Sequence, residues 1–247
     1  MTDPLLPLLE LPGVTAAVTA ARDAVDRVHR HPANRRGWPT TAAEASVRAA
    51  RASAAIDGGR VEIPADGAVT DPIFAGALRV AEAIGPLLPT WRRAPLQALA
   101  RLHVLAAADL GLAESELGRP RPEPGIAERL DLLASLLVAE SAVPAPVLAA
   151  VVHGELLALA PFGTADGVVA RAATRLTLIA TGLDPKGLVV PEVALLRRGP
   201  AYPAAAEAFA SGTPEGVGAW VVFCAKTIAD GAKEAGSIAD AAGQTAS

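Results

Sequence analysis

A tight polar loop between two apolar segments is the part of this sequence best suited to chemistry. The loop Ala160-Pro161-Phe162-Gly163-Thr164-Ala165-Asp166 separates the apolar segments Pro146–Leu159 and Gly167–Thr181. If both segments are helices, free backbone N–H groups and the positive end of a helix dipole converge at the start of the second one. A phosphate or carboxylate is favoured there. The spacing predicts an anion site, and it equally allows Asp166 to be a plain N-cap.

Three residues of this region keep a spacing that is known from a protein family. Phe162, Gly167 and Arg171, with Pro161 in register, resemble the Fic (Fido) signature H-x-F-x-[DE]-G-N-G-R-x-x-R. His153, seven residues before the motif, also matches the preceding family helix, as Leu102-His103 does further upstream. The resemblance covers roughly Pro72 to Lys233 and implies an all-α, Fic-like helical domain.

Other motif positions depart from the family pattern. In active members the motif His accepts a proton, the acid holds Mg²⁺, and the Gly-Asn-Gly-Arg run cradles the phosphates of ATP. Here Ala160 stands for the His, Thr164 for the acid, Asp166 for the Asn and Val168 for the first Arg. An alanine cannot accept a proton, and a lone hydroxyl is a poor ligand for Mg²⁺. The resemblance implies ATP and magnesium, but these residues favour a protein impaired in AMP transfer, with no catalytic residue or metal ligand assigned.

A second match lies near the N-terminus. Ser53-Ala54-Ala55-Ile56-Asp57-Gly58 resembles the inhibitory-helix motif [ST]-x-x-x-E-[GN] of the family, with Asp in place of Glu. In the family that acid pairs with the last motif Arg and blocks productive placement of the ATP γ-phosphate. The resemblance therefore implies a pair between Asp57 and Arg171, and a carboxylate facing a guanidinium is well matched.

Three functional hypotheses follow. The leading one is a pseudoenzyme that acts by binding a protein partner or a small ligand. Its candidate ligand-binding residues are Pro161, Phe162, Gly163, Thr164, Asp166, Gly167, Arg171 and His153, and its candidate inhibitory residues are Ser53, Asp57 and Gly58. The alternative for His153 is a structural role as a partly buried side chain. The second hypothesis is a transferase with altered Fic-type chemistry on a phosphate-containing donor. The third is an unrelated soluble helical interaction domain.

The composition bounds these hypotheses. Hydrophobic residues make up 51% of the 247 residues and aromatic residues only 3%, so Ala, Leu and Val dominate, which favours an all-α fold. The net charge is −4, and the 22 Lys and Arg are distributed along the chain, which argues against a nucleic-acid partner. Cys224 is the single cysteine, so neither a disulfide nor a thiolate metal site is expected.

The sequence also carries expectations about location and assembly. It contains neither an uncharged apolar stretch of about 18 residues nor a signal-peptide pattern, which predicts a cytoplasmic protein without a membrane partner. Its many Ala and Leu residues are compatible with a homo-oligomer.

Apolar periodicity and helix-ending residues place the elements around the loop. We expect residues 1–71 to form an N-terminal helical extension, 72–235 the Fic-like core, and 236–247 a flexible tail. Arg60–Pro64 is compatible with a short strand. The predicted helices are Val14–His29, Thr41–Ile56, Pro72–Leu88, Pro95–Leu110, Ala127–Val138, Pro146–Leu159, Gly167–Thr181, Pro200–Gly212 and Gly216–Lys233.

Overall fold

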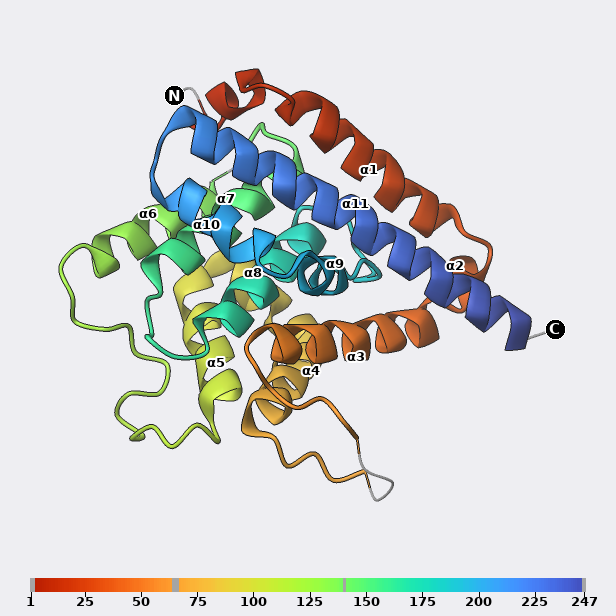
Figure 1. Cartoon of the computed structure of the whole chain (residues 1–247), viewed down its shortest axis with the longest axis horizontal. Helices are drawn as coiled ribbons and strands as arrows, with labels where there is room; N and C mark the ends of the chain where they lie inside the picture. The colour runs from red at the N-terminus through yellow and green to blue at the C-terminus, as the bar shows by residue number, and fades with distance from the viewer. Residues whose placement is uncertain (1–2, 64–66, 140, 246–247) are drawn as a thin grey trace.

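Helices joined by loops make up the computed structural model, which describes residues 3–63, 67–139 and 141–245 (Figure 1). The described residues contain no strand, which confirms the all-α prediction. The helices are η1 (Leu6–Glu10), α1 (Val14–Arg30), α2 (Ala33–Arg36), α3 (Trp38–Ile56), α4 (Pro72–Arg93), α5 (Pro95–Ala107), α6 (Ile126–Val138), α7 (Ala145–Leu159), α8 (Asp166–Ala180), α9 (Pro191–Arg198), α10 (Ala201–Ala210) and α11 (Pro214–Thr245).

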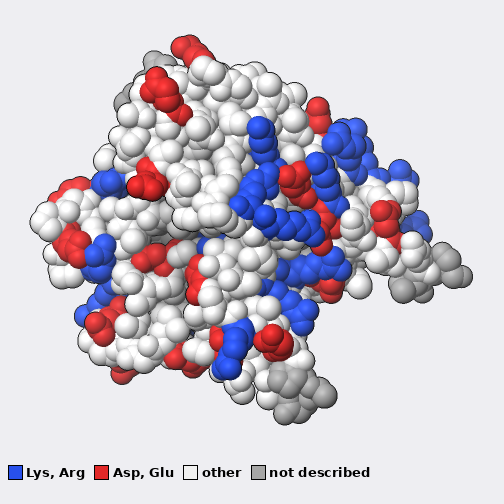
Figure 2. Space-filling view, viewed as in Figure 1, with Lys and Arg blue, Asp and Glu red and all other residues white. Residues whose placement is uncertain are grey.

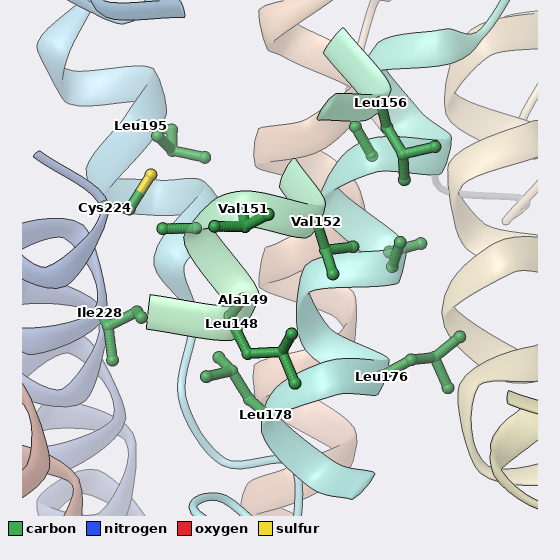
Figure 3. Close-up of a cluster of buried hydrophobic side chains, with 14 of the residues drawn as sticks. Leu148, Ala149, Val151, Val152, Leu156, Leu176, Leu178, Leu195, Cys224 and Ile228 are labelled. Atoms are coloured by element: carbon green, nitrogen blue, oxygen red, sulfur yellow. The ribbon is translucent and has the colours of Figure 1, made fainter. Parts of the chain in front are cut away.

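Helices α7 and α8 form the centre of the molecule. They pack against each other. Helices α4 and α5 cover α8, whereas α10 and α11 cover α7. α7 is buried on nearly all sides, as expected for a helix that is apolar all round. Figure 3 shows the resulting cluster, with side chains contributed by α7, α8, α9 and α11; they include Leu148, Val152, Leu156, Leu176, Leu178, Leu195, Cys224 and Ile228. The loop between α7 and α8 is therefore anchored at both ends in the core.

Helix α4 is the one helix of the described chain whose length and composition would allow it to cross a membrane. In this fold it packs between α3, α5 and α8, and Phe74, Val80 and Trp91 are buried in these contacts.

The first and last helices lie side by side along one edge of the molecule (Figure 1). α1 packs lengthwise on α11, and His29 Nε2 lies 2.8 Å from Asp184 Oδ1 after α8. α3 crosses below them and contacts α4, α8, α9 and α11. The N-terminal helices are thus built into the same packed body as the core, and α3 brings its C-terminal end to α8.

Ion pairs reinforce the junction of α3, α9 and α11. Arg48 and Arg197 both contact Glu234, at 2.7 and 2.9 Å, and Arg198 contacts Asp230 at 2.8 Å. Basic and acidic side chains interleave over part of the face drawn in Figure 2. Exposed pairs of this kind contribute little singly, about 0–1 kcal/mol each, so the apolar core carries most of the stability.

Several boundaries differ from those expected from the sequence. α4 continues through Pro86 and Pro89 to Arg93, because both prolines lie on its outer side while Trp91 anchors the last turn in the core. The helix α9 is absent from the predicted set, since its eight residues are too few for a clear periodic pattern.

The loop after α3 and the C-terminal segment also differ from the sequence prediction. Arg60–Ile63 is irregular, and Pro64 lies outside the described residues. Beyond Gly236, where composition indicated a flexible tail, α11 continues to Thr245, because Ile238 and Ala239 are buried against neighbouring helices.

Candidate functional site

The loop between α7 and α8 is shaped by three residues with left-handed backbone conformations. Ala160 ends α7 with φ 42°, Gly163 has φ 74°, and Ala165 precedes α8 with φ 52°. Left-handed residues turn the chain sharply, and two of the three are alanines, for which this conformation is uncommon. The core contacts of α7 and α8 therefore hold a strained, well-defined turn in place.

Asp166 occupies the position where an anion was expected to bind. Its Oδ1 accepts a hydrogen bond of 2.9 Å from the Phe162 N–H. Burial raises the pKa of Asp166 to about 6, while the backbone N–H groups of Phe162 and Gly163 act in the opposite direction. The carboxylate thus engages a backbone donor of the loop, the Phe162 N–H, and not the first N–H groups of α8. Asp166 is therefore not the N-cap that the sequence allowed: Ala165 holds that position, without a side-chain cap, and Asp166 is the first residue of the helix.

Thr164 and Phe162 are both held by His103 of α5. The Gly118 N–H donates to His103 Nδ1 at 2.9 Å, so the ring proton lies on Nε2, which donates to Thr164 Oγ1 at 3.2 Å. The His103 ring stacks on Phe162 with centroids 4.2 Å apart. Burial lowers the pKa of His103, which keeps the imidazole neutral. The sequence indicated His103 only through the match of Leu102-His103 to a helix of the family, without a role for the side chain.

Arg121 closes the other side of the loop. Its Nε donates to the Ala160 carbonyl at 3.1 Å and its Nη2 to the Leu159 carbonyl at 3.3 Å, so it satisfies the end of α7. It also forms an ion pair with Glu123. The Pro161 carbonyl accepts the Arg121 backbone N–H at 2.8 Å. The motif does not include this residue, which lies in an irregular loop far from it along the chain.

Asp57 and Arg171 form the ion pair that the resemblance implied. Arg171 Nη2 lies 2.9 Å from Asp57 Oδ1, and Arg171 also donates to Ser53 Oγ and to the Ser53 carbonyl, at 2.8 and 3.0 Å. α3 ends at Ile56, and Gly58, with φ 84°, turns the chain away and leaves Asp57 facing α8. Gly167 leaves room for the pair, since a Cβ there would lie 2.8 Å from Asp57 Oδ1.

His153 lies behind Arg171 and is fully buried. Its Nε2 is 2.6 Å from the Tyr202 hydroxyl, which itself interacts with Arg171. Because Arg171 can only donate, the hydroxyl accepts from Arg171 and donates to His153. Burial lowers the pKa of His153 to about 3 and raises that of Tyr202 to about 12. Both groups stay neutral, and Tyr202 interacts with Arg171 from the interior side.

The remaining motif positions are structural. Val168, at the place of the first motif Arg, is buried in the core. Pro161 is buried beside Phe162, and Ala160 presents only a methyl group. Among the described residues, no group of three or more His, Cys, Asp or Glu side chains has the arrangement of a metal site.

A cavity of about 580 Å³ lies beside the Asp57–Arg171 pair. The end of α3, the end of α7, the start of α8 and the α9–α10 region form its walls; they include Ala55, Ile56, Asp57, Leu157, Gly167, Arg171, Leu195, Leu196, Pro200, Tyr202, Pro203 and Ala206. Its volume is within the usual range of small-molecule sites. The structure therefore brings Asp57, Gly167 and Arg171 to one cavity, while Phe162, Thr164 and His153 are engaged elsewhere.

Comparisons with known proteins identify the architecture. No family model and no curated protein sequence matches this chain. Two solved structures are similar over most of its length. A Fic family protein from Desulfovibrio desulfuricans matches 92% of this chain and 74% of its own, with a TM-score of 0.67 and 21% identity. Fic-1 from C. elegans matches 95% of this chain and 74% of its own, with a TM-score of 0.70 and 17% identity. The chain therefore has a Fic-like fold, as the motif resemblance predicted.

Proposed function

We propose that this protein is a Fic-like binding protein that does not transfer AMP by the family mechanism. The observation that carries the proposal is the contact of the Asp166 carboxylate with the Phe162 N–H of its own loop. A phosphate entering this turn would meet a negative charge and a Phe162 N–H that is already engaged. Displacing Asp166 would cost the hydrogen bond and strand a half-buried carboxylate.

The absence of a base at the motif supports the same proposal. Ala160 carries no proton acceptor, and the two nearest imidazoles are committed to other partners. His103 keeps its proton on Nε2 toward Thr164, and His153 is buried behind Arg171. A general base typically contributes about 10²–10⁴ in rate. The carboxylate of the same loop, Asp166, is engaged by the Phe162 N–H.

ATP and magnesium, which the family resemblance implies, do not fit these residues. Thr164 is the single oxygen side chain at the metal position, and its hydroxyl oxygen already accepts a hydrogen bond from His103. Mg²⁺ prefers carboxylate and phosphate oxygens, and the nearby Asp166 is turned into the loop. We derive no catalytic step through either group.

The proposal includes the division of the chain expected from its sequence and a binding partner of either kind. Residues 1–71 act as an extension that places Asp57 on Arg171, 72–235 form the Fic-like core, and the partner is a small ligand or a protein. A cytoplasmic location and self-association belong to the same proposal.

Incubation with labelled ATP and Mg²⁺ tests the proposal, with calorimetry of ATP binding alongside. We expect no protein label and no ATP binding above background. Label on the wild type that is absent from Arg171→Ala would contradict the proposal. Label that is also lost in Thr164→Ala would favour the altered transferase instead, because the hydroxyl at 164 would then take part in the reaction.

A further inference from the structure

The cavity beside Asp57 and Arg171 has walls that are mainly apolar. The apolar wall residues come from α3, α7, α9 and α10; they are Ala55, Ile56, Leu157, Leu195, Leu196, Pro200, Pro203 and Ala206. Leu196, which also lines the cavity, is 41% exposed. Such walls bind hydrocarbon and contribute nothing to the binding of a polar or multiply charged molecule.

One ion pair forms the polar part of this cavity. The two partners differ in how firmly they are held: the Arg171 side chain is 2% exposed, whereas the Asp57 side chain is 26% exposed. Arg171 keeps its bonds to Ser53 and its contact with Tyr202 if Asp57 leaves. Asp57 has no comparable second anchor among the described contacts of its side chain. Asp57 is therefore the removable member of the pair.

A single carboxylate matches the position that Asp57 would vacate. A ligand carboxylate facing Arg171 would replace one negative charge by another, so the buried charge balance would not change. The guanidinium recognises a planar carboxylate through parallel hydrogen bonds. A polyphosphate would bring several negative charges to one arginine, because the described side chains lining this cavity include no second Lys or Arg.

We propose that this cavity binds an aliphatic monocarboxylate, whose chain lies on the α9–α10 wall and whose carboxylate displaces Asp57 from Arg171. The inference rests on the proposed function as a binding protein and names the chemical class of its ligand. Asp57 is then an internal competitor for the ligand. Ligand binding would break the Asp57–Arg171 contact, while the bonds from Arg171 to Ser53 keep the end of α3 on α8.

Calorimetry with octanoate on the full chain tests this inference, with 1-octanol as the matched neutral probe. Octanoate is expected to bind. The affinity for octanol is expected to be lower by a factor of about ten or more, because octanol cannot form a charge-assisted pair with Arg171. Asp57→Asn is expected to bind octanoate about tenfold more tightly, since the competing charge is removed. Equal affinities for octanoate and octanol, or an unchanged affinity in Asp57→Asn, would overturn the carboxylate assignment.

Two tryptophan variants of α10 locate the site. Ala206 lines the cavity, whereas Ala204 is exposed on the same helix. Ala206→Trp is expected to abolish octanoate binding and Ala204→Trp to leave it unchanged, with both folded by circular dichroism. Octanoate binding by Ala206→Trp at wild-type affinity would place the site elsewhere.

The labelled-ATP experiment separates the two proposals. No octanoate binding together with no label overturns this inference alone. Label transfer from ATP overturns the proposed function on which it rests.

Discussion

The Asp166 side chain changes the chemistry of a loop that otherwise resembles the Fic motif. The loop keeps the turn, the glycine before the helix and the arginine after it, yet the carboxylate at 166 is folded back onto the Phe162 N–H. Its burial raises its pKa, so the folded state holds this proton more firmly than the unfolded chain does. At neutral pH the group is largely ionised, and the loop keeps its own anion.

Replacing Asp166 by Asn tests this electrostatic account. The pKa of Asp166 is 3.8 in the unfolded reference and about 6 in the folded protein. Its contribution to stability is therefore fully present below 3.8, is lost as the pH rises to about 6, and stays lost above that. We expect Asp166→Asn to gain stability relative to the wild type as the pH rises through this window.

Thermal unfolding from pH 4 to pH 8 measures the difference between the two proteins. Asp131→Asn, a change at an exposed carboxylate on α6, serves as the control. A stability difference that stays constant with pH would contradict the account.

At the scale of elements, close backbone contacts fix how α4 and α5 place His103 beneath the loop. Gly76 of α4 lies against the backbone of Ala106 in α5, and a Cβ at 76 would lie 2.2 Å from the Ala106 carbonyl oxygen. Gly85, nine residues later in the same helix, faces open space. The two glycines therefore have different roles although both interrupt a helical sequence.

A pair of substitutions in α4 tests this packing. We expect Gly76→Ala to destabilise the protein by about 1–3 kcal/mol, because the helices must separate, and Gly85→Ala to stabilise it by about 0.5–1 kcal/mol through backbone entropy. Urea denaturation measures both. Equal effects of the two changes would show that the α4–α5 contact is not constrained at Gly76.

At the scale of the whole molecule, α11 connects the N-terminal helices with the core. It contacts α1, α2, α3, α7, α9 and α10, and its final turns carry Ile238 into a small cluster with Ala45, Ala49 and Val190. This cluster joins α3, which bears Asp57, to the segment that leads into α9. The end of α11 therefore contributes to the position of the cavity walls.

Truncating Ile238 tests this connection. Ile238 is 3% exposed, so Ile238→Ala is expected to lower the free energy of unfolding by about 2 kcal/mol or more. Ser237→Ala, at an exposed neighbouring position, is expected to change it by less than about 0.5 kcal/mol. Urea denaturation with a single transition measures both. A negligible effect at Ile238 would indicate that the last turns of α11 are not part of the folded core.

The sequence by itself determined the helical fold and the frame of the site. Its Ala- and Leu-rich composition and the spacing of Phe162, Gly167 and Arg171 are local properties, and local properties can be read from a linear pattern. The Asp57–Arg171 pair was available only through the family resemblance, since 114 residues separate its partners in the sequence.

Only the tertiary structure decided what the site contains. His103, Arg121 and Tyr202 come from three helices or loops outside the motif, and their roles depend on which surfaces pack together. The same holds for α9, which is too short to be stable alone, and for the end of α11, whose burial overrides a polar composition. Asp166 was a possible cap in the sequence; its contact with Phe162 follows from the turn that the packed helices impose. Packing and long-range hydrogen bonds, which the order of residues does not display, therefore determine which ligand the Fic-like frame can accept.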